Sequence, residues 1–184
     1  MASKICRKIA IVGDDNSGKT CLLLVYCKGV FPKFYVPTIY DFDSVVDVNV
    51  DGKHVELALR DSSEKEDYVK LRILSYLDCN VILICFSIDS PNSLDNVTSK
   101  WYPEVLHYRK LSSTKIILVG CKKDLRNNAS VIEELKKFHQ KPVTYDEGKA
   151  VADEIFADYV ECSALEKDGV NEVFELIARA SLIR

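Results

Sequence analysis

Four residues at fixed spacing, Gly13, Gly18, Lys19 and Thr20, could bind the phosphate groups of a nucleotide. They lie in the stretch VGDDNSGKT at 12–20 and fit the pattern G-x-x-x-x-G-K-[ST]. In such a loop the backbone N–H groups and the positive end of the following helix attract phosphate oxygens. Lys19 is expected to reach the β- and γ-phosphates, and the Thr20 hydroxyl to ligate Mg²⁺. The pattern therefore predicts a phosphate loop for a nucleoside triphosphate.

The middle of this loop is unusual. Asp15, Asn16 and Ser17 stand where a triphosphate would favour small, uncharged residues. Two unit charges 4 Å apart interact by roughly 4 kcal/mol at an effective dielectric constant of 20, so the Asp15 carboxylate bears on both binding and chemistry. An exposed carboxylate can also turn into solvent, where its charge is screened. The loop alone leaves open whether the site hydrolyses its nucleotide or only holds it.

The elements on either side must position this loop. The run KICRKIAIVG at 4–13 indicates a buried strand, and residues 19–29 have helical spacing that ends at a glycine. Strands and helices then alternate, which predicts an α/β doubly wound, mostly parallel sheet with the loop at the carboxyl end of its first strand. We expect a hairpin at 44–50 and 54–61, strands at 80–88, 114–121 and 158–164, and helices at 90–110 (N-cap Ser90, then Pro91), 130–138, 144–156 and 169–182.

The composition is that of one globular domain. The chain has 184 residues, of which 47% are hydrophobic and 29% charged, and its formal net charge is -3. With no basic stripe, this charge argues against nucleic-acid binding. The apolar run near the N-terminus is far too short for a signal peptide or a membrane span. Seven cysteines form no C-x-x-C pair and several lie in apolar runs, so we expect reduced, mostly buried thiols in a cytosolic protein.

Beyond the phosphate loop, six segments resemble the Rho family of small GTPases over nearly the whole chain. They are FPKFYVPTIYDF (31–42), LALRDSS (57–63), EDYVKLRILSY (66–76), VILICFSIDSPNSLDNVTSKWYPEV (81–105), ILVGCKKDLRN (117–127) and VECSALEKDGVNEVFE (160–175). The resemblance implies a single P-loop small GTPase domain over 1–184, with a six-stranded mostly parallel sheet and helices on both faces. The helix expected at 130–138 falls where this family carries its insert helix.

The resemblance also implies roles for individual residues. Thr38 would join Thr20 on Mg²⁺ and touch the γ-phosphate, Tyr35 would cover the phosphates, and Asp61 would orient Mg²⁺ through water. Phe31 would pack on guanine, Asp124 would accept its two N–H groups, and Lys122 would lie along the base, while a backbone N–H at 163–164 would meet O6. The implied nucleotide-binding set is Gly13, Asp15, Asn16, Ser17, Gly18, Lys19, Thr20, Cys21, Phe31, Tyr35, Thr38, Cys121, Lys122, Asp124, Leu125, Ser163, Ala164 and Leu165.

The hydrolytic residues depart from the family pattern. Where the family has DTAGQE, this chain has DSSEKE at 61–66. Glu64 replaces the glycine whose N–H senses the γ-phosphate, and Lys65 replaces the glutamine that orients the attacking water. A lysine donates hydrogen bonds but cannot accept one, so it cannot hold water as glutamine does. Asp15 also stands at a position that is usually glycine, so no catalytic residue is intact. The alternative is that these changes are harmless and that another group orients the water.

Two further departures resemble the Rnd branch of the Rho family, which hydrolyses GTP poorly or not at all. Cys121 replaces the asparagine of N-K-x-D, and Leu165 replaces the lysine of S-A-K. The stretch PVTYDEG at 142–148 also resembles that branch. Rnd-like sequences usually keep the glycine at position 64, so the geometry there stays open. The Glu64 carboxylate has three places to go: solvent, Lys65, or a nearby basic residue.

We therefore expect a GTP-bound, Rnd-like signalling module that acts on cytoskeletal effectors through its switch regions, 30–43 and 61–77. The alternatives are a slow but cycling GTPase and a scaffold that binds nucleotide weakly or prefers GDP. Arg60 stands at a position that exchange factors read, so ordinary exchange factors are doubtful partners. Asp15 makes ordinary activating proteins doubtful as well. Phe42 stands where Rho has an asparagine that toxins modify. We expect a cytoplasmic monomer, membrane-associated only if a lipidated tail follows, because the sequence ends after its last helix without a C-a-a-X box.

Overall fold

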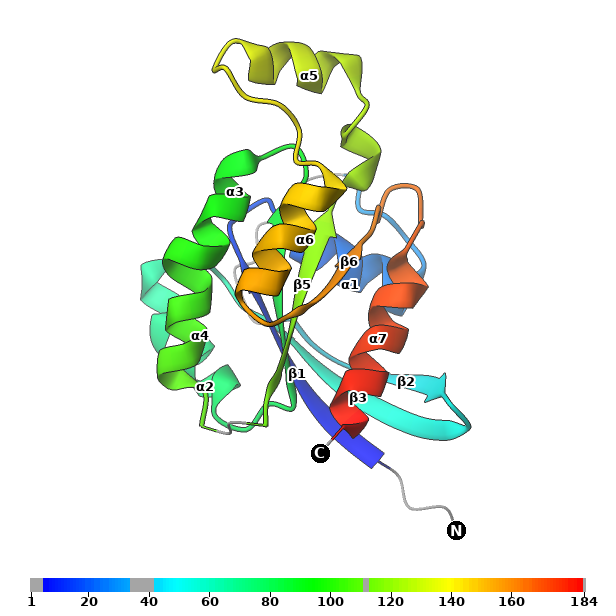
Figure 1. Ribbon diagram of the computed structural model, residues 1–184. Helices are drawn as coiled ribbons and strands as arrows, with labels where there is room; N and C mark the ends of the chain where they lie inside the picture. Colours follow the sequence, from blue (N-terminus) through cyan, green and yellow to red (C-terminus); the bar gives the residue numbers. More distant parts are fainter. Residues whose placement is uncertain (1–4, 34–41, 111–112, 184) are drawn as a thin grey trace.

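The computed structural model describes residues 5–33, 42–110 and 113–183, which build a central sheet with helices on both faces (Figure 1). The strands are β1 (Ile5–Gly13), β2 (Phe42–Val50), β3 (Lys53–Asp61), β4 (Val81–Ser87), β5 (Lys115–Cys121) and β6 (Asp158–Glu161). Their order is β2-β3-β1-β4-β5-β6. β2 is antiparallel to β3, and the other neighbouring pairs are parallel. The predicted mostly parallel α/β sheet is confirmed.

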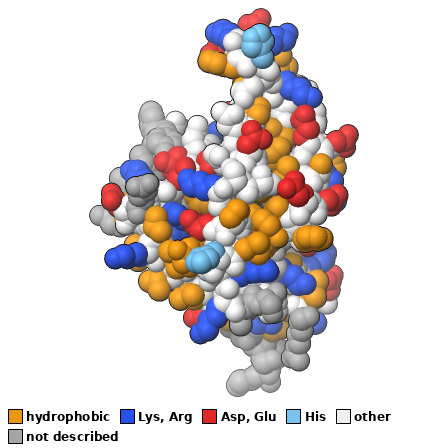
Figure 2. Space-filling model, turned by 60° about the vertical axis from the view of Figure 1, so that its left-hand side comes forward, with side chains coloured by type: hydrophobic (Ala, Val, Ile, Leu, Met, Phe, Trp, Pro, Cys, Tyr) orange, Lys and Arg blue, Asp and Glu red, His pale blue; other side chains and the backbone are white. Residues whose placement is uncertain are grey.

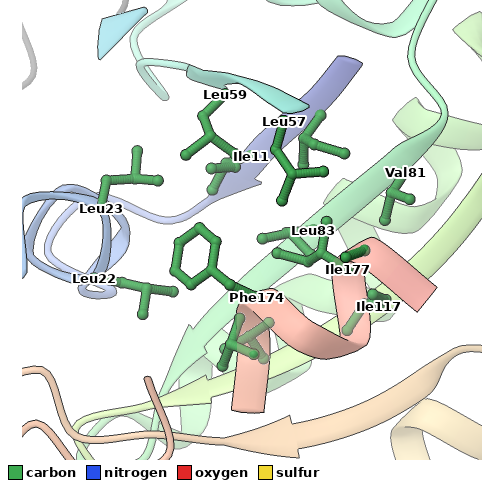
Figure 3. Close-up of a cluster of buried hydrophobic side chains, with 14 of the residues drawn as sticks. Ile11, Leu22, Leu23, Leu57, Leu59, Val81, Leu83, Ile117, Phe174 and Ile177 are labelled. Atoms are coloured by element: carbon green, nitrogen blue, oxygen red, sulfur yellow. The ribbon is translucent and has the colours of Figure 1, made fainter. Parts of the chain in front are cut away.

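The sheet is buried on both faces, which explains why its central strands are apolar at nearly every position. Successive side chains of a strand point to opposite faces. Ile9 and Ile11 of β1 belong to one core layer, covered by α1 (Lys19–Lys28) and α7 (Val170–Leu182). Figure 3 shows Leu22, Phe174 and Ile177 of these helices over the sheet. Ala10 and Val12 belong to the opposite layer, covered by α2 (Val69–Tyr76), α3 (Pro91–Asn96), α4 (Tyr102–Tyr108) and α6 (Tyr145–Glu154).

Local signals set the ends of the helices near the site. α1 follows Gly18 and ends at Gly29, and both glycines have left-handed backbone angles, with φ of 101° and 67°. α6 begins at a capping box, in which the Thr144 hydroxyl accepts from the Glu147 N–H and the Glu147 carboxylate accepts from the Thr144 N–H. The sequence prediction placed this helix correctly but did not identify its cap.

The helix predicted at 90–110 contains a turn of π-helix. Between α3 and α4 lies η2 (Val97–Trp101), where the N–H of Tyr102 donates to the carbonyl of Val97, five residues earlier. Ser90 occupies the predicted N-cap position and Pro91 begins the helix, although the Ser90 side chain makes no capping hydrogen bond. A π-turn places side chains five residues apart on one face of the helix, and such turns are frequent at functional sites.

The remaining helical segments lie at the edges of the molecule. The helix predicted at 130–138 is α5 (Ala129–Lys136), which projects from the body at the top of Figure 1 and buries none of its residues. The Asn128 side chain caps it by accepting from the Val131 N–H at 3.2 Å. Two short 3₁₀ turns, η1 (Glu66–Tyr68) and η3 (Lys123–Leu125), flank the site, and the sequence analysis missed both η1 and α2. Among the described residues, no helix is long and apolar enough to cross a membrane.

Candidate nucleotide-binding site

The predicted phosphate loop lies at the carboxyl end of β1, where it turns from the sheet into α1. Gly13 has φ of 143°, and a Cβ atom there would lie 2.1 Å from the carbonyl oxygen of Cys85 in β4. Both the backbone angle and this close approach require glycine. Asn16 has φ of 61° and is exposed, as is Asp15. The loop is therefore tightly fitted against the sheet at its start and open to solvent in its middle.

Lys19 is folded across this loop and almost fully buried. Its Nζ atom donates to the carbonyl oxygens of Gly13 at 2.8 Å and Asp14 at 2.7 Å. Ser17 is also buried, with its hydroxyl 3.5 Å from the same Nζ atom. A buried ammonium group needs such partners. These contacts hold the positive charge at the place where a phosphate loop presents it to the nucleotide.

Two of the three residues expected near Mg²⁺ are in direct contact. The Thr20 hydroxyl donates to Asp61 Oδ2 at 2.6 Å, across the pairing of β1 with β3 that sets Ile11 beside Asp61. Hydroxyl and carboxylate oxygens suit Mg²⁺, which usually retains waters and takes further ligands from phosphates. The described residues hold no group of three or more acidic, histidine or cysteine side chains that could bind a metal by themselves. Thr38 and Tyr35 lie outside the described residues.

A cavity of about 150 Å³ lies where the resemblance places the guanine base. It opens between the start of α1 and the loops that follow β5 and β6, and most of its wall is apolar or formed by thiols. Leu22 and Cys162 belong to this wall although the sequence analysis did not predict them. Leu22 lies one helical turn after Gly18, and Cys162 directly precedes Ser163, so sequence proximity was their only signal. The lining residues are Gly18, Cys21, Leu22, Phe31, Cys121, Lys122, Asp124, Leu125, Cys162, Ala164 and Leu165.

Asp124 is held in place by the neighbouring loop. The Ser163 hydroxyl donates to Asp124 Oδ1 at 2.6 Å and accepts from the N–H of Glu166 at 3.0 Å. The Ser163 N–H donates to the Asp168 carbonyl at 2.8 Å. Ser163 therefore orients Asp124 through its side chain, and its own N–H is engaged within the protein, which leaves the predicted contact with guanine O6 to Ala164.

Cys121 stands at the floor of this cavity, where the family pattern has asparagine. The described chain carries all seven cysteines as free thiols, and Cys79, Cys85, Cys121 and Cys162 are buried, as expected. The Cys121 thiol shares hydrogen bonds with the thiols of Cys85 and Cys162. The hydrogen bond with Cys121, together with burial, raises the pKa of the Cys162 thiol far above its usual range. The base pocket thus has a thiol at its floor in place of a polar amide.

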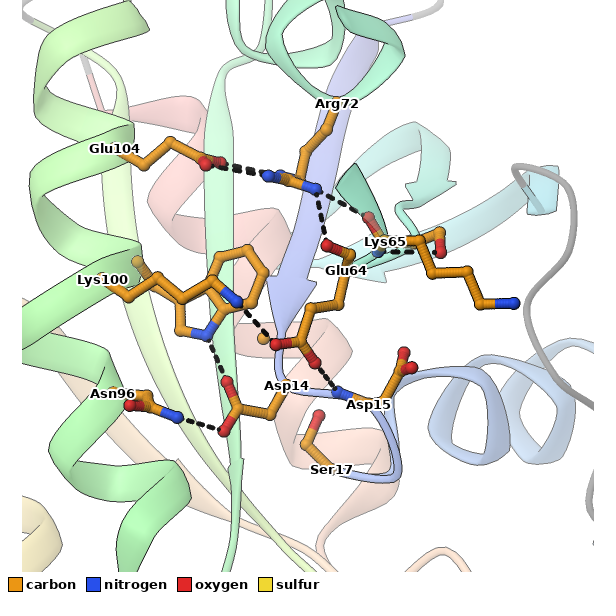
Figure 4. A network of polar contacts seen from close by, with 12 residues as sticks. Asp14, Asp15, Ser17, Glu64, Lys65, Arg72, Asn96, Lys100 and Glu104 are labelled. Atoms are coloured by element: carbon orange, nitrogen blue, oxygen red, sulfur yellow. Dashed lines mark hydrogen bonds and ion pairs between the residues drawn. The ribbon is translucent and has the colours of Figure 1, made fainter. Parts of the chain in front are cut away.

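Glu64 lies against the phosphate loop (Figure 4). Its Oε2 atom accepts from the backbone N–H of Asp15 at 2.5 Å, and its Oε1 atom accepts from Lys100 Nζ at 2.5 Å. Burial alone would raise the pKa of the Glu64 carboxyl, but these hydrogen bonds outweigh it and lower the pKa overall. Of the three places expected for this carboxylate, it takes the nearby base. Lys65 is exposed, and in Figure 4 its side chain points away from Glu64 and Lys100.

Comparison with known proteins agrees with this geometry. The Ras family model matches residues 8–183. Rho5 of Schizosaccharomyces pombe, named a GTP-binding protein, is 56% identical over 185 residues, which cover 100% of this chain and 91% of rho5. Rho1 of the same yeast is 57% identical, over 100% of this chain and 90% of rho1. RHO1 of Saccharomyces cerevisiae is 56% identical, over 100% of this chain and 87% of RHO1. These relatives give no support to the expected placement in the Rnd branch.

Proposed function

Because this chain belongs to the Rho family of Ras-type GTP-binding signalling proteins, we propose that its specialisation is to hold GTP while hydrolysing it very slowly. The observation that carries this proposal is the state of Lys65. This residue occupies the position of the water-orienting glutamine, offers no acceptor atom, and directs its side chain away from Glu64 (Figure 4). Without an acceptor there, an attacking water lacks half of its orienting contacts.

The groups that bind nucleotide are present. Lys19 is held at the phosphate loop, Thr20 and Asp61 lie together for Mg²⁺, and Asp124 faces the base cavity. When bound, Mg²⁺ would neutralise phosphate charge, with Thr20 and Thr38 as ligands and Asp61 acting through water. Because cells hold more GTP than GDP, a protein that binds both and consumes neither stays loaded with GTP. Cys121 and Leu165 weaken the base contacts without removing Asp124.

One observation favours the alternative of a scaffold that prefers GDP. The Glu64 carboxylate brings a negative charge to the Asp15 N–H, next to the place of a third phosphate. Against this, the ammonium of Lys100 bonds to the same carboxylate and offsets its charge. The slow, cycling GTPase is the second alternative, and it differs from the proposal only in rate.

We place the effector contacts on the two switch regions. In the second, α2 exposes Leu71 and Leu74, which are 48% and 56% accessible. Exposed apolar patches with a polar rim mark protein-interaction sites. Most of the first switch region lies outside the described residues. The proposal includes a monomeric cytoplasmic protein that acts on effectors of the cytoskeleton and responds weakly to exchange and activating proteins.

Single-turnover hydrolysis tests the proposal directly. The protein is loaded with GTP, and phosphate release is followed beside rho1 of Schizosaccharomyces pombe as the matched control. We expect no measurable release during the time in which rho1 completes one turnover. Release at the rate of rho1 would leave the cycling GTPase as the correct function.

A further inference from the structure

The contact of Glu64 with the phosphate loop affects how the protein responds to the third phosphate of its nucleotide. Resting on the proposed function as a guanine-nucleotide-binding protein, we infer that the Glu64 carboxylate is an internal anion that fixes the second switch against the phosphate loop. The second switch would then keep one conformation whether the bound nucleotide has two phosphates or three. Lys100 is the positioning residue that holds this carboxylate.

The carboxylate joins three elements that are far apart in sequence. Glu64 follows β3, Asp15 lies in the phosphate loop, and Lys100 lies in the π-turn η2. The Glu64 side chain is only 26% exposed, and both of its oxygens are engaged. Hydrogen bonds that involve an ionised group are the stronger ones in proteins. The second switch is therefore tied to the loop by a group that belongs to the protein itself.

The π-turn gives Lys100 a fixed position. The Lys100 ammonium lies 4.5 Å from the centre of the Trp101 ring, and Trp101 is fully buried. Trp101 Nε1 donates to one oxygen of Asp14 at 2.7 Å, and Asn96 Nδ2 donates to the other at 2.6 Å. Asn96 and Trp101 are five residues apart, so the π-turn brings both to one carboxylate. The same helical segment thus binds the phosphate loop through Asp14, and it binds Glu64 through its own Lys100.

The backbone around Glu64 is held from its other side as well. Arg72 of α2, which is buried, donates to the Ser63 carbonyl at 2.8 Å. The same guanidinium donates to the two carboxylate oxygens of Glu104 in α4, at 2.7 and 2.9 Å. Tyr76 donates to Glu104 at 2.6 Å. The start of the second switch is therefore anchored to α2 and α4 in addition to the phosphate loop.

A third phosphate would find this position already occupied by an anion. In the family pattern residue 64 is the glycine whose N–H senses the γ-phosphate, so the phosphate itself orders the second switch. Here the Asp15 N–H is already used by Glu64, and the approaching phosphate would meet a carboxylate. The third phosphate therefore adds less to affinity, and a partner that reads the second switch would bind the GDP and GTP forms alike.

Two measurements on the full chain test this inference. The first is hydrogen exchange of residues 61–77 with bound GDP and with a non-hydrolysable GTP analogue. The second is the ratio of the affinities for these two nucleotides. In the natural protein we expect equal protection in both states. In Glu64→Gly we expect protection with GDP to fall about tenfold and the affinity ratio to move about tenfold towards the analogue, which is the effect of one hydrogen bond to a charged group.

Two further variants separate charge from folding. Glu64→Gln keeps the shape and removes the charge, so its affinity ratio should move in the same direction as in Glu64→Gly. Lys100→Met should also lower protection with GDP, and Lys100→Arg should restore it, whereas Lys136→Met on the exposed α5 should change nothing. Protection that differs between the two nucleotides in the natural protein, or that is unchanged in both Glu64 variants, would overturn the inference. Fast phosphate release from GTP would instead overturn the proposed function. It would leave the inference about Glu64 standing, since both measurements use an analogue that cannot be hydrolysed.

Discussion

At the scale of single residues, three positions together carry the proposed loss of hydrolysis. Lys65 lacks an acceptor, Glu64 holds the Asp15 N–H, and the Asp15 side chain stands at the open edge of the phosphate loop. We predict that Lys65→Gln alone rescues little, because the other two changes remain. The triple variant Asp15→Gly, Glu64→Gly, Lys65→Gln should hydrolyse bound GTP at the rate of an ordinary Rho protein in a single-turnover assay.

Adding an activating protein to the natural protein should not restore hydrolysis as the three substitutions do. An arginine supplied by such a protein accelerates hydrolysis by ~10³–10⁵ only when the water is oriented and the space beside the loop is open. The natural protein should therefore remain slow with an activating protein added, and the triple variant should respond to it. An ordinary rate in the Lys65→Gln variant alone would show that Asp15 and Glu64 are harmless.

The choice of guanine should depend on Asp124. A carboxylate accepts the two N–H groups of guanine, and adenine cannot offer them. We predict that Asp124→Asn shifts the preference towards xanthine nucleotides, measured by competition titration. Ser163→Ala is the matched control, since it keeps the Asp124 carboxylate and removes the hydroxyl that orients it, together with that hydroxyl's bond from the Glu166 N–H. It should weaken guanine binding by about 1 kcal/mol without changing the preference. Comparable affinities of the natural protein for ATP and GTP would contradict this assignment.

At the scale of elements, sequence periodicity predicted the strands and most helices because each buries a regular apolar face. It missed the π-turn at Val97–Trp101, since an apolar pattern of period 3.6 continues through the turn. The partner of Glu64 could not be predicted for a related reason. Lys100 is 36 residues away, and the packing of η2 beside the phosphate loop brings the two together. The Thr144 and Glu147 cap, by contrast, is visible in the sequence as T-x-x-E.

The turn that leads from β6 into α7 depends on a glycine at one position. Gly169 has φ of 75°, and a Cβ there would lie 2.4 Å from the Glu161 carbonyl oxygen. Gly52 in the hairpin has nearly the same angle, 73°, but open space around it. Gly52→Ala should therefore show backbone strain alone, and Gly169→Ala should cost about 1–3 kcal/mol more in the free energy of unfolding, by urea titration. Equal losses in the two variants would contradict the close packing of this turn.

The pairing of α2 with α4 rests on Arg72 and Glu104. Burial alone would raise the pKa of the Glu104 carboxyl, but hydrogen bonds from Arg72 and Tyr76 lower it overall. Because the pKa is lower in the folded state, the pair stabilises the protein above the usual range of a glutamate pKa. This stability is lost as the pH falls through the lowered value.

We predict that Arg72→Met reduces the free energy of unfolding at neutral pH by ~3 kcal/mol, because it leaves a half-buried carboxylate without its partner. The loss should shrink in acid, where Glu104 is protonated in both forms. Urea titrations of the natural protein and the variant across the acid range measure this. A difference that does not change with pH would assign the effect to packing instead.

At the scale of the whole molecule, five departures from the Rho pattern belong to the nucleotide site, while the framework around it is kept. The Ras family model spans residues 8–183, and the sheet order places the phosphate loop at the carboxyl end of the interior strand β1. Glu64 contacts Asp15 at the phosphate end, with Lys65 next to it in the chain, and Cys121 and Leu165 line the base end. A chain that had lost nucleotide binding would not need to keep Lys19 and Asp124 so closely held.

The nucleotide that the protein carries when freshly purified, with no ligand added, tests the central claim most directly. It can be released by denaturing the protein and identified by chromatography. Our account predicts mainly GTP, because the site binds guanine nucleotide and lacks an oriented water to consume it. Mainly GDP would contradict the account and show that the protein either hydrolyses GTP or selects GDP.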